Sequence, residues 1–255
     1  MSSPTPPPRL PMGGRVVRLD SVPSTSDVAK QLTRAGEPHG TVVVAAEQTR
    51  GRGQRGRRWA SPRGGLWVSL LTRPAGMSAP QAGLLNIAAA VATAEAVSEA
   101  SGLSVVLKWP NDLLVAGRKV GGVLVETAAV GGHLEWAVIG IGVNVNIARD
   151  ALPRQLRATA TTLRDEMGGD VALDRLLSGL CGRVEQVLQL LESGNDVEVV
   201  RRWRALDTTA GRVVRSAADR GWRGRAAGID AHGWLMVRTK GGLVALPTSA
   251  GISIE

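Results

Sequence analysis

The chain has 255 residues, of which 44% are hydrophobic and 21% charged, a composition typical of a globular protein with a proper core rather than of a disordered chain. The formal net charge of +9 is typical of proteins with an anionic partner, yet the basic residues are spread along the chain without a tail of like charges. No run of 18 uncharged apolar residues occurs, so no membrane-spanning helix is expected. The single cysteine, Cys181, lies in an apolar helical pattern, which predicts a buried spacer in a cytoplasmic protein.

The N-terminal part of the chain begins with a segment rich in Pro and Gly, and we expect residues 1–14 to be disordered. They lack the apolar stretch of a secretory signal. A short strand is predicted over 15–20, followed by a helix over about 27–34. Three hydroxyl residues, Ser24–Ser26, stand where that helix begins. They either cap the helix or, with the free amides of its first turn, face a small polar ligand, and the sequence leaves both interpretations open.

The most distinctive segment is EQTRGRGQRGRRW, over Glu47–Trp59. It follows a β-branched apolar run over 41–46 that predicts a buried strand, so the segment is expected at the edge of a sheet. Its glycines let the backbone approach a ligand, and its arginines offer planar donors to carboxylate or phosphate oxygens. Trp59 offers a flat face to a heterocycle. A solvated basic loop is the alternative interpretation.

A predicted hairpin covers residues 103–126, in which two apolar runs flank a turn at 116–118. Pro110 interrupts the first run, so the backbone there is expected to be irregular. Asp112 then lies between apolar segments, where it either caps its own turn or serves a ligand. Lys119 begins the second run beside two glycines, and it is either an edge lysine that discourages aggregation or a ligand contact.

The rest of the chain changes character near residue 207. Before that point, hydrophobic periodicity predicts strands over 65–72 and 136–147 and helices over 79–101, 173–191 and 196–206. The glycines of GIG at 140–142 lack the third glycine of a dinucleotide fingerprint, and no Walker-type loop occurs, so neither site is expected. Shorter apolar runs with recurrent glycines follow, which predict a small β-barrel. We therefore expect a domain over 15–206 and a second domain over 207–255.

Four motifs, in this order and spacing, resemble those of the biotin–protein ligases: GRGxxGRxW, KWPND, KxGGxLVE and GIGxNxN. The resemblance covers residues 15–165 closely and the C-terminal domain loosely. It implies an α+β fold, with a mixed-sheet catalytic domain of the class II synthetase-like type, helices on one face, and a C-terminal SH3-like barrel. It also implies a ligase that activates biotin with ATP to biotinoyl-5′-AMP and transfers biotin to a lysine of a biotin carboxyl carrier protein. Magnesium is then expected on the ATP phosphates and not in a protein-held metal site.

The same resemblance assigns roles to individual residues. It makes Lys119, Arg52 and Asp112 catalytic, because fixed cations must hold the biotin carboxylate against an anionic α-phosphate. In addition, Asp112 is expected to orient the incoming lysine amine. The expected biotin-binding residues are Ser24, Thr25, Ser26, Gln48, Arg52, Gly53, Gln54 and Lys119. The expected ATP- or adenylate-binding residues are Arg52, Arg55, Trp59, Lys108, Asn111, Asp112, Lys119 and Asn144.

Departures from the family and competing interpretations complete the expectations. Many members carry Arg where this chain has Gln54 and Asn where it has Ser26, and some have a basic residue near the acidic end at Glu255. Bifunctional members need roughly 60 residues for a DNA-binding module; with 14 residues before the first strand, we expect a monofunctional ligase that binds no DNA and no membrane. The alternatives are a lipoate– or octanoate–protein ligase or transferase on the same fold, or a basic nucleic-acid-binding module. The oligomeric state is open, and paired hairpins or sheet edges would give a homodimer.

Overall fold

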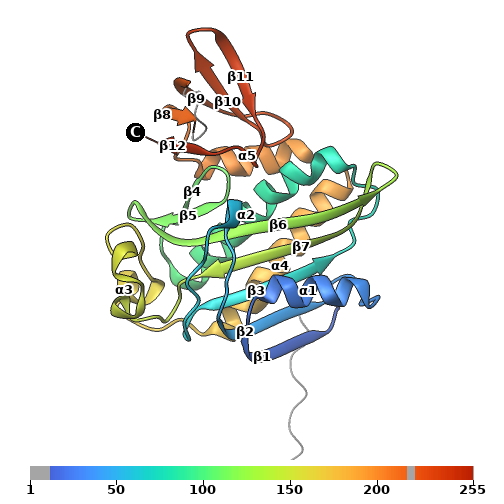
Figure 1. Ribbon diagram of the computed structural model, residues 1–255, viewed down its shortest axis with the longest axis vertical. Helices are drawn as coiled ribbons and strands as arrows, with labels where there is room; N and C mark the ends of the chain where they lie inside the picture. Colours follow the sequence, from blue (N-terminus) through green and yellow to red (C-terminus); the bar gives the residue numbers. More distant parts are fainter. Residues whose placement is uncertain (1–11, 217–221, 255) are drawn as a thin grey trace, which may run out of the picture.

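Runs of β-branched and apolar residues form a seven-stranded mixed sheet with the strand order β1-β2-β3-β7-β6-β5-β4 (Figure 1). This computed structural model describes residues 12–216 and 222–254. Strands β1 and β2 pair in parallel, and the other neighbours in the sheet pair antiparallel. The strands of this sheet are β1 (Val16–Val22), β2 (Val42–Gln48), β3 (Leu66–Thr72), β4 (Val106–Lys108), β5 (Asp112–Val115), β6 (Arg118–Val130) and β7 (His133–Val143).

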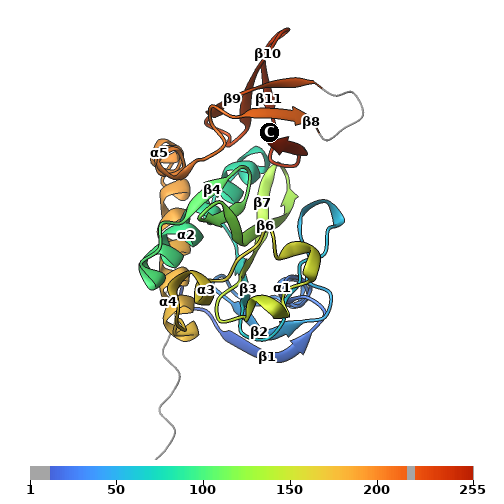
Figure 2. The same cartoon turned by 90° about the vertical axis from the view of Figure 1, so that its left-hand side faces the viewer.

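Helices cover both faces of this sheet, as the turned view shows (Figure 2). The long helices α2 (Ala82–Ser101), α4 (Leu173–Glu192) and α5 (Asp196–Leu206) lie on one side, and α1 (Thr25–Arg34) lies on the other. The alternation along β2 fits this arrangement, because Val42 packs into the main core beside α2 and Val43 packs with Ala29 of α1. The expectation of helices on one face holds for α2, α4 and α5. It is wrong for α1, which covers the other face. The strands β1 and β2 are parallel, so the chain needs a crossover connection between them, and α1 forms it.

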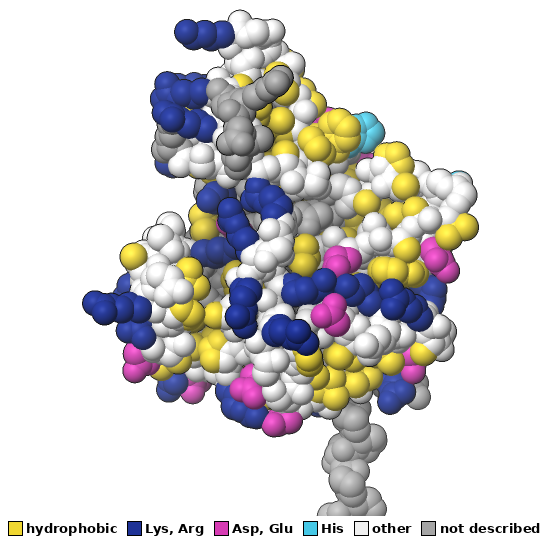
Figure 3. All heavy atoms as spheres, viewed as in Figure 1, with side chains coloured by type: hydrophobic (Ala, Val, Ile, Leu, Met, Phe, Trp, Pro, Cys, Tyr) yellow, Lys and Arg dark blue, Asp and Glu magenta, His cyan; other side chains and the backbone are white. Residues whose placement is uncertain are grey.

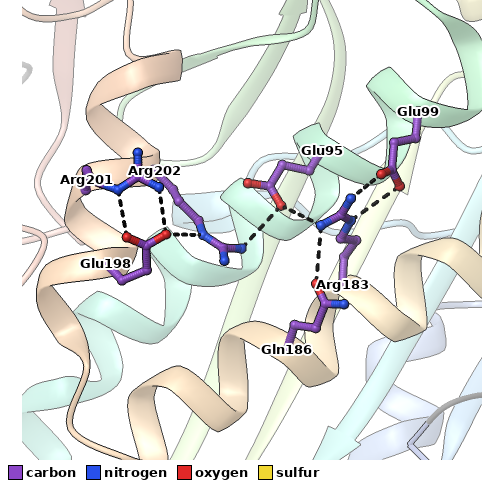
Figure 4. Close-up of polar contacts among 7 residues, drawn as sticks. All are labelled: Glu95, Glu99, Arg183, Gln186, Glu198, Arg201 and Arg202. Carbon is purple, nitrogen blue, oxygen red and sulfur yellow. Dashed lines mark hydrogen bonds and ion pairs between the residues drawn. The ribbon is translucent and has the colours of Figure 1, made fainter.

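Ion pairs join the three long helices on their outer side (Figure 4). Arg183 of α4 pairs with Glu99 and, at 3.6 Å, with Glu95, both on α2. Arg202 of α5 lies 3.5 Å from the same Glu95 carboxylate and 2.8 Å from Glu198. Cys181 is buried in α4, as predicted for a spacer, and burial raises the pKa of its thiol to about 12. These ion pairs therefore connect the three helices that pack on this side of the sheet.

The segment predicted as one hairpin contains two turns. The turn at Ala116–Gly117 joins β5 to β6 as predicted, and both residues have positive φ angles of 48° and 76°. The motif that interrupts the first run is itself a turn: Lys108 of β4 and Asp112 of β5 face each other as antiparallel partners. The polar residues of KWPND are therefore held at a tight reversal of the chain at the edge of the sheet.

The C-terminal residues form a five-stranded antiparallel sheet of order β11-β10-β9-β8-β12, in the region where the glycine spacing predicts short strands and a small barrel. Its strands are β8 (Val213–Ser216), β9 (Arg223–Ile229), β10 (Leu235–Thr239), β11 (Gly242–Leu246) and β12 (Ile252–Ile254). Trp109 links it to the larger sheet, since its backbone N–H donates to Thr209 Oγ1 at 2.8 Å and its indole Nε1 donates to the Gly233 carbonyl at 3.1 Å.

The ends of the chain complete the fold. Residues 1–11 of the segment expected to be disordered lie outside the described residues, as does Glu255. Met12 is described and buried in the core, so order begins before the first strand. The remaining helix, α3 (Leu163–Met167), is short. Across 12–216 and 222–254, no helix has the length and apolar character needed to cross a membrane.

Candidate active site

A cavity of about 290 Å³ lies against the face of the larger sheet that carries α1. Its walls come from the start of α1, the loop after β2, the β4–β5 turn, strands β6 and β7, and, from the C-terminal sheet, Ala250 and Ile252. Lys and Arg side chains gather over the middle of this face and on the neighbouring C-terminal sheet (Figure 3). The cavity is lined by every residue proposed above for a site, namely Ser24, Thr25, Ser26, Gln48, Arg52, Gly53, Gln54, Arg55, Trp59, Lys108, Asn111, Asp112, Lys119 and Asn144.

One end of the cavity is a buried group of hydroxyls at the start of α1. Ser24 occupies the N-cap position, yet its side chain makes no capping hydrogen bond. The side chain of Thr25 forms hydrogen bonds to neighbouring strands, with its Oγ1 2.8 Å from Ser69 Oγ and 3.1 Å from Gln48 Oε1. Ser26 Oγ lies 3.0 Å from the same Ser69 hydroxyl. These contacts fix a polar, largely buried surface suited to a ligand group that both donates and accepts hydrogen bonds.

The sequence analysis missed Ser69, which does not line the cavity but supports two hydroxyl residues that do. It is fully buried in the middle of β3, where its hydroxyl joins those of Thr25 and Ser26. The available signal was one serine inside the apolar run GLWVSLLT, since a buried hydroxyl needs a partner.

Two glycines of β7 make room for the site. A Cβ on Gly140 would lie 2.6 Å from Ser26 Oγ, and a Cβ on Gly142 would lie 2.8 Å from Trp59 Nε1. Real Cβ atoms essentially never come within 3.0 Å of another heavy atom, so a side chain at either position would force its neighbour to move. The GIG motif therefore serves as bare backbone, against which the hydroxyl end and the indole of Trp59 both pack.

Arg52 lines the cavity and is held by residues that do not line it. Its Nη2 donates to the Glu126 carboxylate and lies 3.2 Å from Asp27 Oδ1. Lys30 Nζ lies 3.1 Å from each of these two carboxylates. Arg52 Nε is buried without a hydrogen-bond partner. Sequence reasoning missed the roles of Asp27, Lys30 and Glu126, although Glu126 ends the motif KxGGxLVE.

Lys119 is the second central cation. Its Nζ donates to the Asp112 carboxylate and lies 5.0 Å from the centroid of a ring of Trp59. The indole Nε1 of Trp59 is buried and has no partner. Because Asp112 itself lines the cavity, an anionic ligand competes with it directly for the ammonium group.

Two buried amides hold the backbone around the cations. Asn111 Nδ2 donates to the Val123 carbonyl, and Asn144 Nδ2 donates to the Thr161 carbonyl at 3.0 Å. Beside them, Gln54–Gly56 forms a single 3₁₀ turn in which Arg55 has a positive φ of 57° and an exposed side chain. Within the described part of the chain, no group of three or more His, Cys, Asp or Glu side chains is arranged to hold a metal ion.

The cavity thus brings together the hydroxyls at the start of α1, two cations, the indole of Trp59 and two buried amides. It suits an elongated ligand with a polar head, an anionic centre and a flat heterocycle. In the protein alone, each of the two cations is paired with a carboxylate, Lys119 with Asp112 and Arg52 with Glu126 and Asp27.

Comparison with known proteins identifies the class. The family model for the biotin/lipoate A/B protein ligase family matches residues 18–144. The chain is 32% identical over 234 residues to the bifunctional ligase/repressor BirA of Bacillus subtilis, across 91% of this chain and 72% of that protein. The chain therefore belongs to this family.

Within the family, the chain is also similar to proteins that are named as biotin ligases. The biotin–[acetyl-CoA-carboxylase] ligase of Mycobacterium tuberculosis is 30% identical over 244 residues, across 92% of this chain and 87% of that protein. A solved structure, the biotin protein ligase from Aquifex aeolicus in complex with biotin and ATP, matches with a TM-score of 0.82 and 27% identity. That match covers 94% of this chain and 99% of the other. The chain is thus a member of the biotin protein ligases, and their fold is its fold.

Proposed function

We propose that this protein activates biotin with ATP to biotinoyl-5′-AMP and transfers the biotinoyl group to a lysine of a biotin carboxyl carrier protein. The observation that carries the proposal is the pair of cations, Arg52 and Lys119, which line one cavity together with buried hydroxyls and the indole of Trp59. The relatives and the solved structure named above are biotin ligases, and the solved one holds biotin and ATP.

In the first step, a carboxylate oxygen of biotin attacks the α-phosphorus of ATP, and pyrophosphate leaves with the electrons of the broken P–O bond. Two unit charges 4 Å apart repel by about 1 kcal/mol in water and by about 4 kcal/mol at an effective dielectric constant of 20. Arg52 and Lys119 offset this repulsion, and their stabilisation grows as negative charge develops at phosphorus. Lys119 exchanges Asp112 for the phosphate, and Arg52 uses its unpartnered Nε.

The two ends of the cavity position the reactants. The hydroxyls of Ser24–Ser26 and the side-chain amide of Gln48 face the ureido ring of biotin, and the indole of Trp59 stacks on adenine. Asn111, Lys108 and Asn144 lie on the nucleotide side. This placement brings the carboxylate and the α-phosphate together between the cations, which is a contribution of proximity.

In the second step, the carrier lysine, as a neutral amine, attacks the acyl carbon and forms an amide bond. AMP leaves with the electrons of the broken C–O bond, and the proton lost from the amine passes to solvent. Asp112, released from Lys119, orients the amine. Magnesium ions carried on the ATP phosphates supply charge neutralisation when bound. The protein is proposed to act in the cytoplasm.

The test is ATP–pyrophosphate exchange with biotin, lipoate and octanoate as separate acids. Biotin should stimulate exchange and the other two should not. Exchange driven by lipoate or octanoate and not by biotin would replace the proposal with the alternative substrate. Mass spectrometry of a purified carrier domain after incubation with biotin and Mg-ATP then tests transfer. If the protein instead showed no ATP turnover and bound DNA with an affinity that falls steeply with salt, a nucleic-acid-binding module would be favoured.

A further inference from the structure

We propose that Glu126 and Asp27 are positioning residues that hold Arg52 in its binding-competent orientation, and that Lys30 keeps this group electrically neutral. The inference rests on the proposed function, because it concerns how Arg52 meets the biotin carboxylate. It adds residues from α1 and β6 that do not line the cavity. We call the four side chains Asp27, Lys30, Arg52 and Glu126 the anchor cluster.

Contacts within the loop fix the backbone of Arg52, but they do not fix the direction of its side chain. Gly53 N–H donates to the Arg57 carbonyl at 2.7 Å, and Arg52 forms an isolated β-bridge with Arg58. A Cβ on Gly51 would lie 2.5 Å from the Trp59 carbonyl oxygen, so this part of the loop is closely packed. Beyond Cβ, however, a flexible arginine has several rotamers, and freezing them costs free energy when the ligand arrives.

The anchor cluster removes this rotamer freedom before a ligand binds. Arg52 Nη2 contacts both Glu126 and Asp27, which come from different elements on the same face of the sheet. A guanidinium has five N–H donors in a rigid plane, so fixing one corner fixes the direction of the others. The buried Nε of Arg52 has no partner. An acceptor from a ligand can satisfy that donor while Nη2 keeps its carboxylates.

Charge explains the presence of Lys30. One arginine with two carboxylates carries a net charge of −1, which would repel an anionic ligand. Lys30 Nζ, 3.1 Å from both carboxylates, brings the net charge to zero. The cluster therefore orients Arg52 without reversing the potential that attracts carboxylate and phosphate. Lys119 differs, because its carboxylate partner Asp112 itself lines the cavity, where a bound anion would compete with it.

The test compares Glu126→Ala, Asp27→Asn and Lys30→Met with wild type by calorimetric titration of biotin and by ATP–pyrophosphate exchange. Glu126→Ala should weaken biotin binding about 10-fold and raise the KM for biotin equally. It should also lower kcat, because Arg52 stabilises the charge that develops at phosphorus, while the melting temperature stays within a few degrees. Glu126→Asp should fall between Ala and wild type. Lys30→Met should also weaken biotin binding, more so at low salt, because it leaves the cluster negative. Glu37→Gln, which breaks the exposed Arg15 pair, is the matched control and should leave both readouts unchanged.

Two results would overturn the inference. One is unchanged biotin affinity in both Glu126→Ala and Asp27→Asn. The other is a parallel loss of ATP affinity and of melting temperature, which marks a general structural role. Wild-type protein that binds biotin without catalysing exchange would contradict the proposed function instead, and the titrations would still decide the role of the anchor cluster.

Discussion

The two glycines of β7 give a prediction with an internal comparison, because each lies beneath a different end of the cavity. Neither Gly140 nor Gly142 has a positive φ, so alanine fits the backbone at both positions. The effect of each substitution is therefore the contact that the new methyl group makes. Gly142→Ala meets Trp59 on the side proposed for the nucleotide, and Gly140→Ala meets Ser26 on the side proposed for biotin.

The size of each effect follows from the distances. The new Cβ of Gly142→Ala would lie 2.8 Å from Trp59 Nε1 and 3.1 Å from Cε2. Comfortable contacts are about 3.5–4.0 Å, so the ring must tilt away by several tenths of an ångström. Overpacking of this kind costs about 1–3 kcal/mol. In Gly140→Ala, Ser26 must turn and lose its bond to Ser69, worth about 0.5–1.5 kcal/mol net.

The assay is steady-state ATP–pyrophosphate exchange with each substrate varied in turn. Gly142→Ala should raise the KM for ATP about 10-fold, equivalent to about 1.4 kcal/mol, and leave the KM for biotin within about twofold. Gly140→Ala should do the reverse, with a smaller effect of about threefold. Gly179→Ala, in open space on α4, is the control and should leave both constants unchanged. If both substitutions in β7 affect the same substrate, the assignment of the two ends is wrong.

Three further predictions concern single side chains. Lys119→Ala and Lys119→Arg should keep the melting temperature within a few degrees yet lower adenylate formation by about 100-fold or more, because neither places an ammonium at the α-phosphate; near-normal exchange would remove Lys119 from the chemistry. Cys181, whose thiol pKa is raised to about 12 by burial, should resist thiol reagents at pH 8 until the protein unfolds, and fast labelling of native protein would contradict its burial. Hydrogen bonds from two arginines of α5 lower the pKa of Glu198 to about 2, so its stabilising effect is present above pH 4.5 and lost as the pH falls toward 2. The melting temperature of Glu198→Gln should therefore approach that of wild type across this range, and a constant difference would refute the pairing.

The sequence predicted the elements well where the hydrophobic period was long. The helix predicted over 196–206 has those bounds, and the one over 173–191 is one residue longer. Strands that end at a glycine were also predicted, because a β-branched run bounded by glycine favours a strand over a helix. The exception was KWPND, expected as an irregular strand and found as a turn between β4 and β5. Proline explained the interruption, but only strand pairing shows that the chain reverses there.

The site residues that lie in the four motifs were predictable from the sequence. The other residues were missed for one shared reason. Ser69 contacts residues more than 40 positions earlier, and Glu126 contacts Arg52 across 74 positions. Such pairs depend on strand register, which places Glu126 opposite Val138 on the face that α1 covers. The GIG motif shows the same limit. Its glycines were excluded from a dinucleotide site by sequence, but the space they leave for Ser26 and Trp59 appears only in three dimensions.

The central claim is that Arg52 and Lys119 hold two mutually repelling anions at the point of reaction. The most direct measurement is a crystal structure of the protein with a non-hydrolysable analogue of biotinoyl-5′-AMP. The acyl-phosphate group should lie between the two side chains, with Lys119 moved from Asp112 to the phosphate and Arg52 still joined to Glu126. An analogue bound with its acyl-phosphate away from both cations would contradict the claim.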